Sequence, residues 1–179
     1  MTEEEELIEC ERVGLDYFDS APVRHVASET IKATPEEIFA VLLDGESWTK
    51  FVWAIEDVVW TSGFPLEVGS TRSVYMKGGI VGHEEFIAYE HGKRMAFRFN
   101  QVYKGSIQAF AEDYQVTELG DGRCRVDWVM AMGVPDRADD TPSGVVANLR
   151  KAMLGAFVRH TLKRFRRYVE SKPVLEGAS

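Results

Sequence analysis

Apolar residues recur every three to four positions between residues 142 and 170, which predicts one long helix near the C-terminus. Thr141 suits the N-cap of this helix, and Pro142 suits its first helical position. One expected inner face contains Val146, Leu149, Met153, Phe157, His160 and Arg164, and a neighbouring stripe contains Leu154, Val158, Thr161, Phe165 and Val169. The first half is apolar almost all round and should be buried, whereas the second half is basic and should reach solvent.

The period changes to two from Ile55 onward, which predicts strands. A further strand is expected before them, at 25–33. Short connections with turn residues, such as Gly78-Gly79, favour antiparallel pairing of neighbours. The six strands expected after Ile55 lie at about 56–62, 69–77, 80–90, 94–102, 108–118 and 124–132.

Two short helices are predicted between the first strand and the next. Thr34 can cap the first of them, with Pro35 at the first helical position and two glutamates in the first turn. Asp44-Gly45 ends it, and residues 46–52 form the second. The expected fold class is therefore α+β, with a seven-stranded curved antiparallel sheet around a long C-terminal helix and two short helices after strand 1.

The chain divides into an acidic N-terminal extension at 1–22, one domain at 23–170 and a C-terminal tail at 171–179. The glutamate run from Glu3 to Glu6 is typical of a solvated charge run. The apolar residues that follow it favour a short helix or a strap lying on the main domain.

Charge and motifs exclude several classes of function. A formal net charge of -8 argues against nucleic acid as the main partner. The sequence contains no apolar run long enough for a transmembrane segment and has an acidic rather than basic start, so we expect a cytoplasmic protein with Cys10 and Cys124 as free thiols. We expect no metal and no cofactor, because metal-ligand spacing, a Gly-x-Gly-x-x-Gly motif and a P-loop are all missing. A Gly-x-Ser-x-Gly elbow is missing too, which argues against a serine hydrolase.

The element order and four phrases resemble one superfamily. The phrases are IKATPEEIFAVLLDGESWTKF, VGSTRSVYM, HEEFIAYEHGKRMAFRF and AEDYQVTELGDGRCRVDW. They are similar to the SRPBCC (START-like, helix-grip) superfamily, within its polyketide cyclase/dehydrase and lipid-transport branch, and most of all to uncharacterised bacterial members. The resemblance covers about 23–170 and implies a hydrophobic cavity between the long helix and the concave face of the sheet. Because this fold hosts carriers, receptors and enzymes, the resemblance alone does not fix the function.

Alternating positions on three predicted strands form an inner face that is rich in methionine and aromatic residues. Such a face suits a ligand cavity, and a filled core is the alternative. The candidate ligand-binding residues are Trp48, Tyr75, Glu85, Phe97, Phe110, Glu112, Tyr114, Trp128, Met130, Met153 and Phe157.

Glu112 is the most informative polar candidate, because it lies between two aromatic residues of that inner face. A buried carboxylate needs a partner or a raised pKa. It either holds a ligand carbonyl or hydroxyl together with Tyr114, or lies hydrated at the cavity mouth, or pairs structurally with an arginine. In the strand at 80–90, either Glu84 or Glu85 points inward. The candidates for catalysis are Glu112, Tyr114, Arg72 and His160.

The sequence is compatible with two main classes of function and a weaker third one. Binding or carriage of a small hydrophobic molecule, such as a lipid, polyketide or aromatic compound, is favoured, because it needs only an apolar pocket with a few polar groups. The alternative is an aromatase/cyclase-like enzyme that uses acid–base residues in the cavity. The third is a regulatory or partner protein with a vestigial cavity. Monomer and dimer both remain open.

Overall fold

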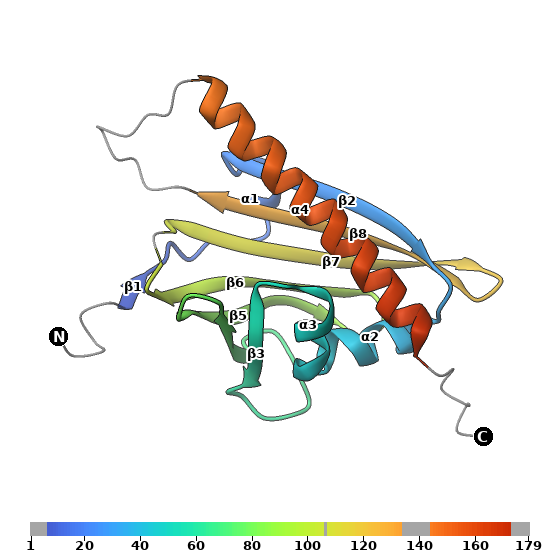
Figure 1. Ribbon diagram of the computed structural model, residues 1–179. Helices are drawn as coiled ribbons and strands as arrows, with labels where there is room; N and C mark the ends of the chain where they lie inside the picture. The colour runs from blue at the N-terminus through green and yellow to red at the C-terminus, as the bar shows by residue number, and fades with distance from the viewer. Residues whose placement is uncertain (1–6, 106, 134–143, 173–179) are drawn as a thin grey trace.

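The computed structural model describes residues 7–105, 107–133 and 144–172. A curved antiparallel sheet lies against one long helix (Figure 1). The elements in chain order are β1 (Leu7–Glu9), α1 (Tyr17–Ser20), β2 (Val23–Ile31), α2 (Pro35–Leu43), α3 (Gly45–Phe51), β3 (Ile55–Trp60), β4 (Thr71–Met76), β5 (Ile80–Glu90), β6 (Arg94–Tyr103), β7 (Ala109–Gly120), β8 (Arg123–Gly133) and α4 (Gly144–Ser171).

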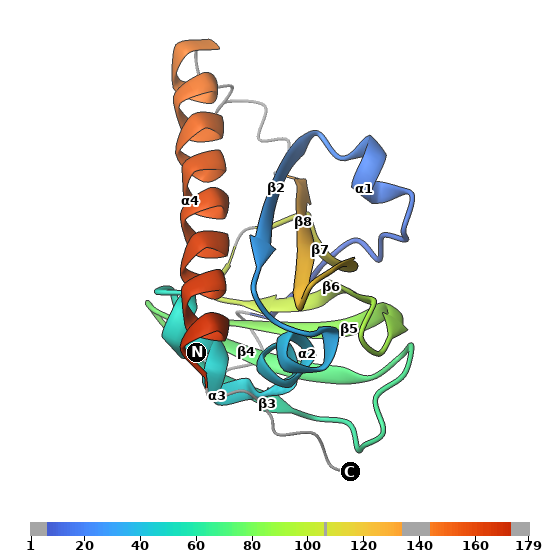
Figure 2. The ribbon, with the colours of Figure 1, turned by 90° about the vertical axis from the view of Figure 1, so that its right-hand side faces the viewer.

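The sheet confirms the predicted seven antiparallel strands, in the order β2-β8-β7-β6-β5-β4-β3. It curls strongly, so that β2 and β8 stand almost upright beside α4 while β5 and β6 lie nearly across it (Figure 2). The eighth strand, β1, pairs with the end of β6 and was not predicted. Its three residues are too few to show a period of two.

The pair α2 and α3 follows β2 as predicted. Thr34 and Glu37 form a reciprocal capping box at the start of α2, with nitrogen–oxygen distances of 2.8 and 3.2 Å. Gly45 begins α3 close to β3, where a Cβ would lie 2.3 Å from the carbonyl oxygen of Val58. The indole of Trp48 donates to the carbonyl of Leu42 at 2.9 Å and ties the two helices together.

The long helix is confirmed, and of the two stripes expected on it the one with Val158, Phe165 and Val169 is buried. The sheet and α3 cover the stripe of Val158, Leu162, Phe165 and Val169. Met153 is 65% exposed and His160 is also exposed, so the expectation that both face inward is wrong. Each lies about half a turn round the helix from Leu162. The predicted cap at Thr141 and Pro142 lies outside the described residues, as do the side chains of Val146 and Leu149.

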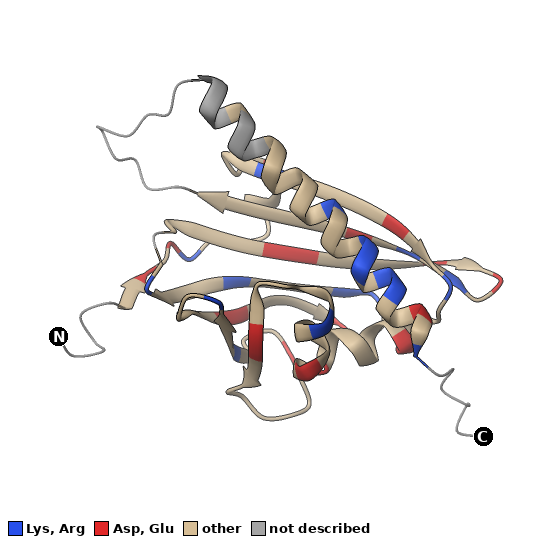
Figure 3. Ribbon diagram, viewed as in Figure 1, with Lys and Arg blue, Asp and Glu red and all other residues tan. Residues whose placement is uncertain are grey.

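The second half of α4 carries basic residues, which Figure 3 shows along the helix. Arg166 bridges to Glu29 of β2 with a nitrogen–oxygen distance of 2.6 Å, and Arg164 donates to the carbonyl of Lys50 in α3. These contacts fix the end of α4 to both neighbours. In the described part of the chain, no helix is long and apolar enough to cross a membrane.

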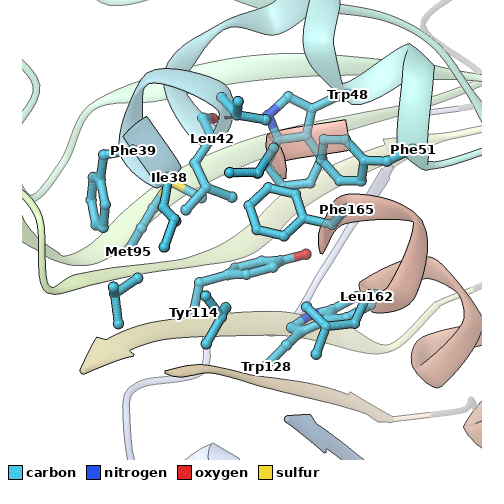
Figure 4. Close-up of a cluster of buried hydrophobic side chains, with 14 of the residues drawn as sticks. Ile38, Phe39, Leu42, Trp48, Phe51, Met95, Tyr114, Trp128, Leu162 and Phe165 are labelled. Carbon is cyan, nitrogen blue, oxygen red and sulfur yellow. Dashed lines mark hydrogen bonds between the residues drawn. The ribbon is translucent and has the colours of Figure 1, made fainter. Parts of the chain in front are cut away.

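The main core lies between α4, the helix pair and the concave face of the sheet (Figure 4). A second, smaller cluster lies on the convex face, where Val13 and Phe18 of the N-terminal segment pack against strand residues. The strand residues in that cluster are Ala96, Ala109, Ala111, Val129 and Ala131. Phe18 packs with the small alanine side chains of this cluster. Arg98 donates to the carbonyl of Val13 at 2.9 Å.

Candidate functional site

A buried ion pair lies on the concave face of the sheet. Arg72 of β4 and Glu84 of β5 are register partners, and the Nε of Arg72 lies 2.5 Å from Oε2 of Glu84. The two side chains are 1% and 4% exposed. Isolated buried charges are costly, so each of these two groups depends on the other.

Aromatic rings surround the guanidinium of Arg72. Its Cζ lies 4.4 Å from the ring centre of Trp48 and 4.5 Å from that of Phe97, with Trp60 and Phe86 farther out. Such cation–π contacts stabilise a desolvated cation by about 2 kcal/mol. Nη1, one of the two terminal nitrogens of this guanidinium, is buried without a hydrogen-bond partner among the described residues.

Glu112 and Tyr114 form a second buried polar pair, two residues apart on the same face of β7. The Tyr114 hydroxyl donates to Oε2 of Glu112 at 3.1 Å. Glu112 is the register partner of Phe97, whose ring lies beneath the Arg72 guanidinium. The four polar side chains therefore belong to one cluster.

Burial, together with the nearby charge of Glu84, raises the pKa of Glu112 from its ordinary value of 4.5 to about 8. The Tyr114 hydrogen bond, Arg72 and the Trp128 indole act in the opposite direction without cancelling the shift. Burial also raises the pKa of Glu84, against the lowering effect of Arg72. Because Glu84 contacts the cation directly, we assign the ionised form to Glu84 and the neutral acid to Glu112 at neutral pH. The cluster is then electrically neutral.

Stacked rings continue the site toward α4. Tyr114 stacks on Trp128 of β8 with ring centres 5.3 Å apart and planes 13° apart. Figure 4 shows Tyr114 between Trp128 and Trp48, with its hydroxyl oxygen toward α4. Burial raises the pKa of Tyr114 well above its ordinary value, so the phenol stays protonated.

The structure brings together most of the residues that the sequence singled out. Trp48, Phe97 and Trp128 lie around the polar cluster, to which Tyr114 itself belongs, and Met130 is the register partner of Glu112. Phe110 and Phe157 are partly buried and pack against core residues. These side chains come from β6, β7, β8, α3 and α4.

Four candidates lie elsewhere, and their expected inward orientation is corrected. Tyr75 is 41% exposed on the outer face of β4, because Arg72 and Val74 take the inner positions. Glu85 points outward, where Arg98 and Asn100 hold its carboxylate at 3.1 and 2.7 Å. Those hydrogen bonds, that of Asn100 above all, lower the pKa of Glu85. The structure does not bring Met153 or His160 to the cluster.

Glu84 is the inward-pointing glutamate of β5, where the sequence allows either Glu84 or Glu85. The sequence offered one usable signal, since Phe86 lies two positions along the same strand and must share its face. Phe86 is fully buried. The described residues contain no group of three histidine, cysteine, aspartate or glutamate side chains that could hold a metal ion.

Comparisons with known proteins agree with this architecture. Uncharacterised proteins of Mycobacterium tuberculosis and Mycobacterium bovis are 39% identical over 163 residues, which cover 91% of this chain and 94% of each relative. The structure of TTHA0849 from Thermus thermophilus superposes with a TM-score of 0.62 at 16% identity, over 82% of this chain and 96% of that one. A START superfamily protein from Mycobacterium smegmatis gives a TM-score of 0.59 at 12% identity, over 82% and 94%.

Residues 22–170 match the sequence profile of a family described as polyketide cyclase / dehydrase and lipid transport. That description covers proteins that handle hydrophobic molecules, so the fold is one that binds hydrophobic ligands. The match spans β2 to α4, including every residue of the polar cluster. The chain therefore belongs to the polyketide cyclase/dehydrase and lipid-transport family, with the helix-grip fold of the START-like proteins.

Proposed function

We propose that this protein binds a small hydrophobic molecule, such as a lipid, polyketide or aromatic compound, between α4 and the concave face of the sheet. The observation that carries this proposal is the buried Glu112, which is surrounded by aromatic rings and has no cation in direct contact among the described residues. Glu84, by comparison, has Arg72 as its partner. Keeping a neutral carboxylic acid inside an aromatic core costs stability and adds nothing to packing, which is typical of a functional polar group.

Side-chain exposure supports an approach to Glu112 from one end of the sheet. Along β7 the inner face changes from the fully covered Tyr114, through Glu112 at 7%, to the half-buried Phe110. The partner strand β8 changes in the same direction, from Trp128 to the half-buried Met132. The burial of side chains on the concave face therefore decreases toward the end of the sheet where Phe110 and Met132 pair.

Native mass spectrometry of the protein purified from its own host tests the proposal. We expect a bound hydrophobic molecule that is released on denaturation. The variant Glu112→Leu should retain less of it than Glu118→Leu, a matched change at an exposed position of the same strand. Ligand-free protein from the host that also fails to bind a hydrophobic dye would contradict the proposal.

The second candidate is an aromatase/cyclase-like enzyme, and the raised pKa of Glu112 favours it specifically. A neutral carboxylic acid can protonate the departing hydroxyl of a β-hydroxy ketone, so that the C–O bond breaks and water leaves. The resulting carboxylate can take the proton from the α-carbon, which forms the enone and restores the acid. Formation of enone absorbance from such a probe, lost in Glu112→Gln, would favour the enzyme over the carrier.

A further inference from the structure

Buried polar atoms without partners in the cluster are hydrogen-bond donors. Among the described residues, Nη1 of Arg72 is buried without a hydrogen bond, and the buried Nε1 of Trp128 lies near the carboxyl of Glu112 without meeting the geometry of a full hydrogen bond to it. Neither nitrogen can accept one. The neutral carboxylic acid of Glu112 adds a third donor, since its Oε2 already accepts from Tyr114.

These donors converge on one place. The Arg72 guanidinium lies over Phe97, the register partner of Glu112. Trp128 stacks on Tyr114, which contacts Glu112 directly. Arg72 and Trp128 both lie close enough to Glu112 to act on its titration. Buried donors left unpaired are costly, so a molecule that supplies an acceptor there gains affinity.

Charge decides what kind of acceptor fits. With Arg72 paired to Glu84 and Glu112 neutral, the cluster carries no net charge. An anionic ligand would leave an uncompensated charge among aromatic rings, which is unfavourable. An alcohol can accept a hydrogen bond but brings a further donor that needs its own acceptor.

We infer that the ligand presents a neutral carbonyl oxygen, as in a ketone, ester or amide, to Nη1 of Arg72, Nε1 of Trp128 and the carboxyl of Glu112. This inference rests on the ligand-binding function proposed above and specifies the chemical group that the site recognises. The hydrocarbon part of the ligand then packs against the neighbouring rings, and the carbonyl sets its orientation.

Displacement of the dye Nile red from the full-length protein by four probes of equal chain length tests this. The probes are methyl nonyl ketone, the matching secondary alcohol, undecane and undecanoate. We expect the ketone to bind about tenfold more tightly than undecane, as one good hydrogen bond to a buried donor allows. The alcohol and the carboxylate should both bind more weakly than the ketone.

Variants then assign the preference to residues. Trp128→Phe keeps an aromatic ring in the stack and removes one donor, so the ratio of ketone affinity to undecane affinity, with both measured in the variant, should fall several-fold. Trp53→Phe, at an exposed indole, is the matched control and should leave the preference intact. If Trp128→Phe does not fold, Glu112→Leu provides the same measurement.

Equal affinity for ketone and undecane in the unmodified protein would overturn the carbonyl inference while leaving hydrophobic binding in place. Tightest binding of undecanoate would overturn it as well, in favour of an anion site. Failure of the dye and all four probes to bind would instead overturn the proposed function itself.

Discussion

The Tyr114 hydroxyl donates to Oε2 of Glu112 at 3.1 Å, and so gives this buried carboxyl a neutral neighbour where Glu84 has a cation. The two glutamates lie on the same concave face and are almost equally buried. Their roles differ because of their partners. Glu84 completes an ion pair, whereas Glu112 holds a proton that a ligand can use.

Glu112→Gln should stabilise the protein at mildly alkaline pH. The pKa of Glu112 is about 8 in the folded chain against an ordinary value of 4.5, with Glu84, Arg72 and Tyr114 as the titratable and charged groups around it. Between those values the folded state holds a proton that the unfolded state has lost, so stability falls as pH rises, by about 1.4 kcal/mol per unit. The glutamine variant has no carboxyl group at this position, so its stability should not fall with pH in this way.

We therefore expect Glu112→Gln to exceed the wild type by about 2–4 kcal/mol near pH 8 and to match it below about pH 4.5. Urea unfolding across this range measures the difference. Glu118→Gln, at an exposed position of the same strand, is the control and should follow the wild-type curve. Parallel curves for all three proteins would show that Glu112 is ionised or hydrated in the folded state.

Arg72→Met should destabilise the protein by about 3–5 kcal/mol, because it leaves the carboxylate of Glu84 buried without its cation. The double variant Arg72→Met/Glu84→Met should recover most of that loss, since no charge remains unpaired. A double-mutant cycle from urea unfolding gives the coupling energy.

The outer-face pair Arg98 and Glu85 provides the comparison, because its side chains keep 16% and 24% exposure. Its coupling energy should be smaller, about 1 kcal/mol or less. A coupling for Arg72 and Glu84 no larger than this would show that water or a rearrangement relieves the inner pair.

Leu162→Ala should cost about 2–5 kcal/mol, because Leu162 is 1% exposed in the core between α4 and the sheet. Met153→Ala, on the same helix at an exposed position, should change stability by less than about 0.5 kcal/mol. Thermal unfolding of the two variants tests which face of α4 is buried. Similar losses of stability for both variants would show that the face of α4 with Met153 is buried as well.

The sequence predicted the fold well where local signals were strong. The start of α2 combines a cap, a proline and acidic residues, and it lies where these signals place it. Alternation along β6, β7 and β8 likewise identified Phe97, Tyr114 and Trp128 as inner residues. The face of α4 could not be predicted, because its first half is apolar almost all round and any face of it looks buried.

The pairing of Arg72 with Glu84 depended on the length of one turn. A two-residue turn at Gly78-Gly79 would pair Lys77 with Ile80 and place Arg72 opposite Glu85. The structure has Met76 opposite Ile80 instead, so Lys77 joins the turn and Arg72 faces Glu84. Neither face of β5 is cleanly apolar, so the pattern of the strand alone leaves Glu84 and Glu85 equally good candidates.

Phe18→Ala tests whether the N-terminal segment contributes stability without taking part in binding. Phe18 is 6% exposed and packs with alanine residues on the convex face, on the opposite side of the sheet from Glu112. Its removal should cost about 3 kcal/mol or more, because a large ring leaves a cavity that the small alanines cannot fill. Leu15→Ala, at a neighbouring position that is 41% exposed, should cost less than about 0.5 kcal/mol. Under conditions where both variants are folded, Nile red affinity should stay within about twofold of the wild type. The packed strands separate the two faces, so the loss of a contact on the convex face should have little effect on binding at the concave face. Loss of dye binding in Phe18→Ala at unchanged stability would show that the segment helps to shape the concave face.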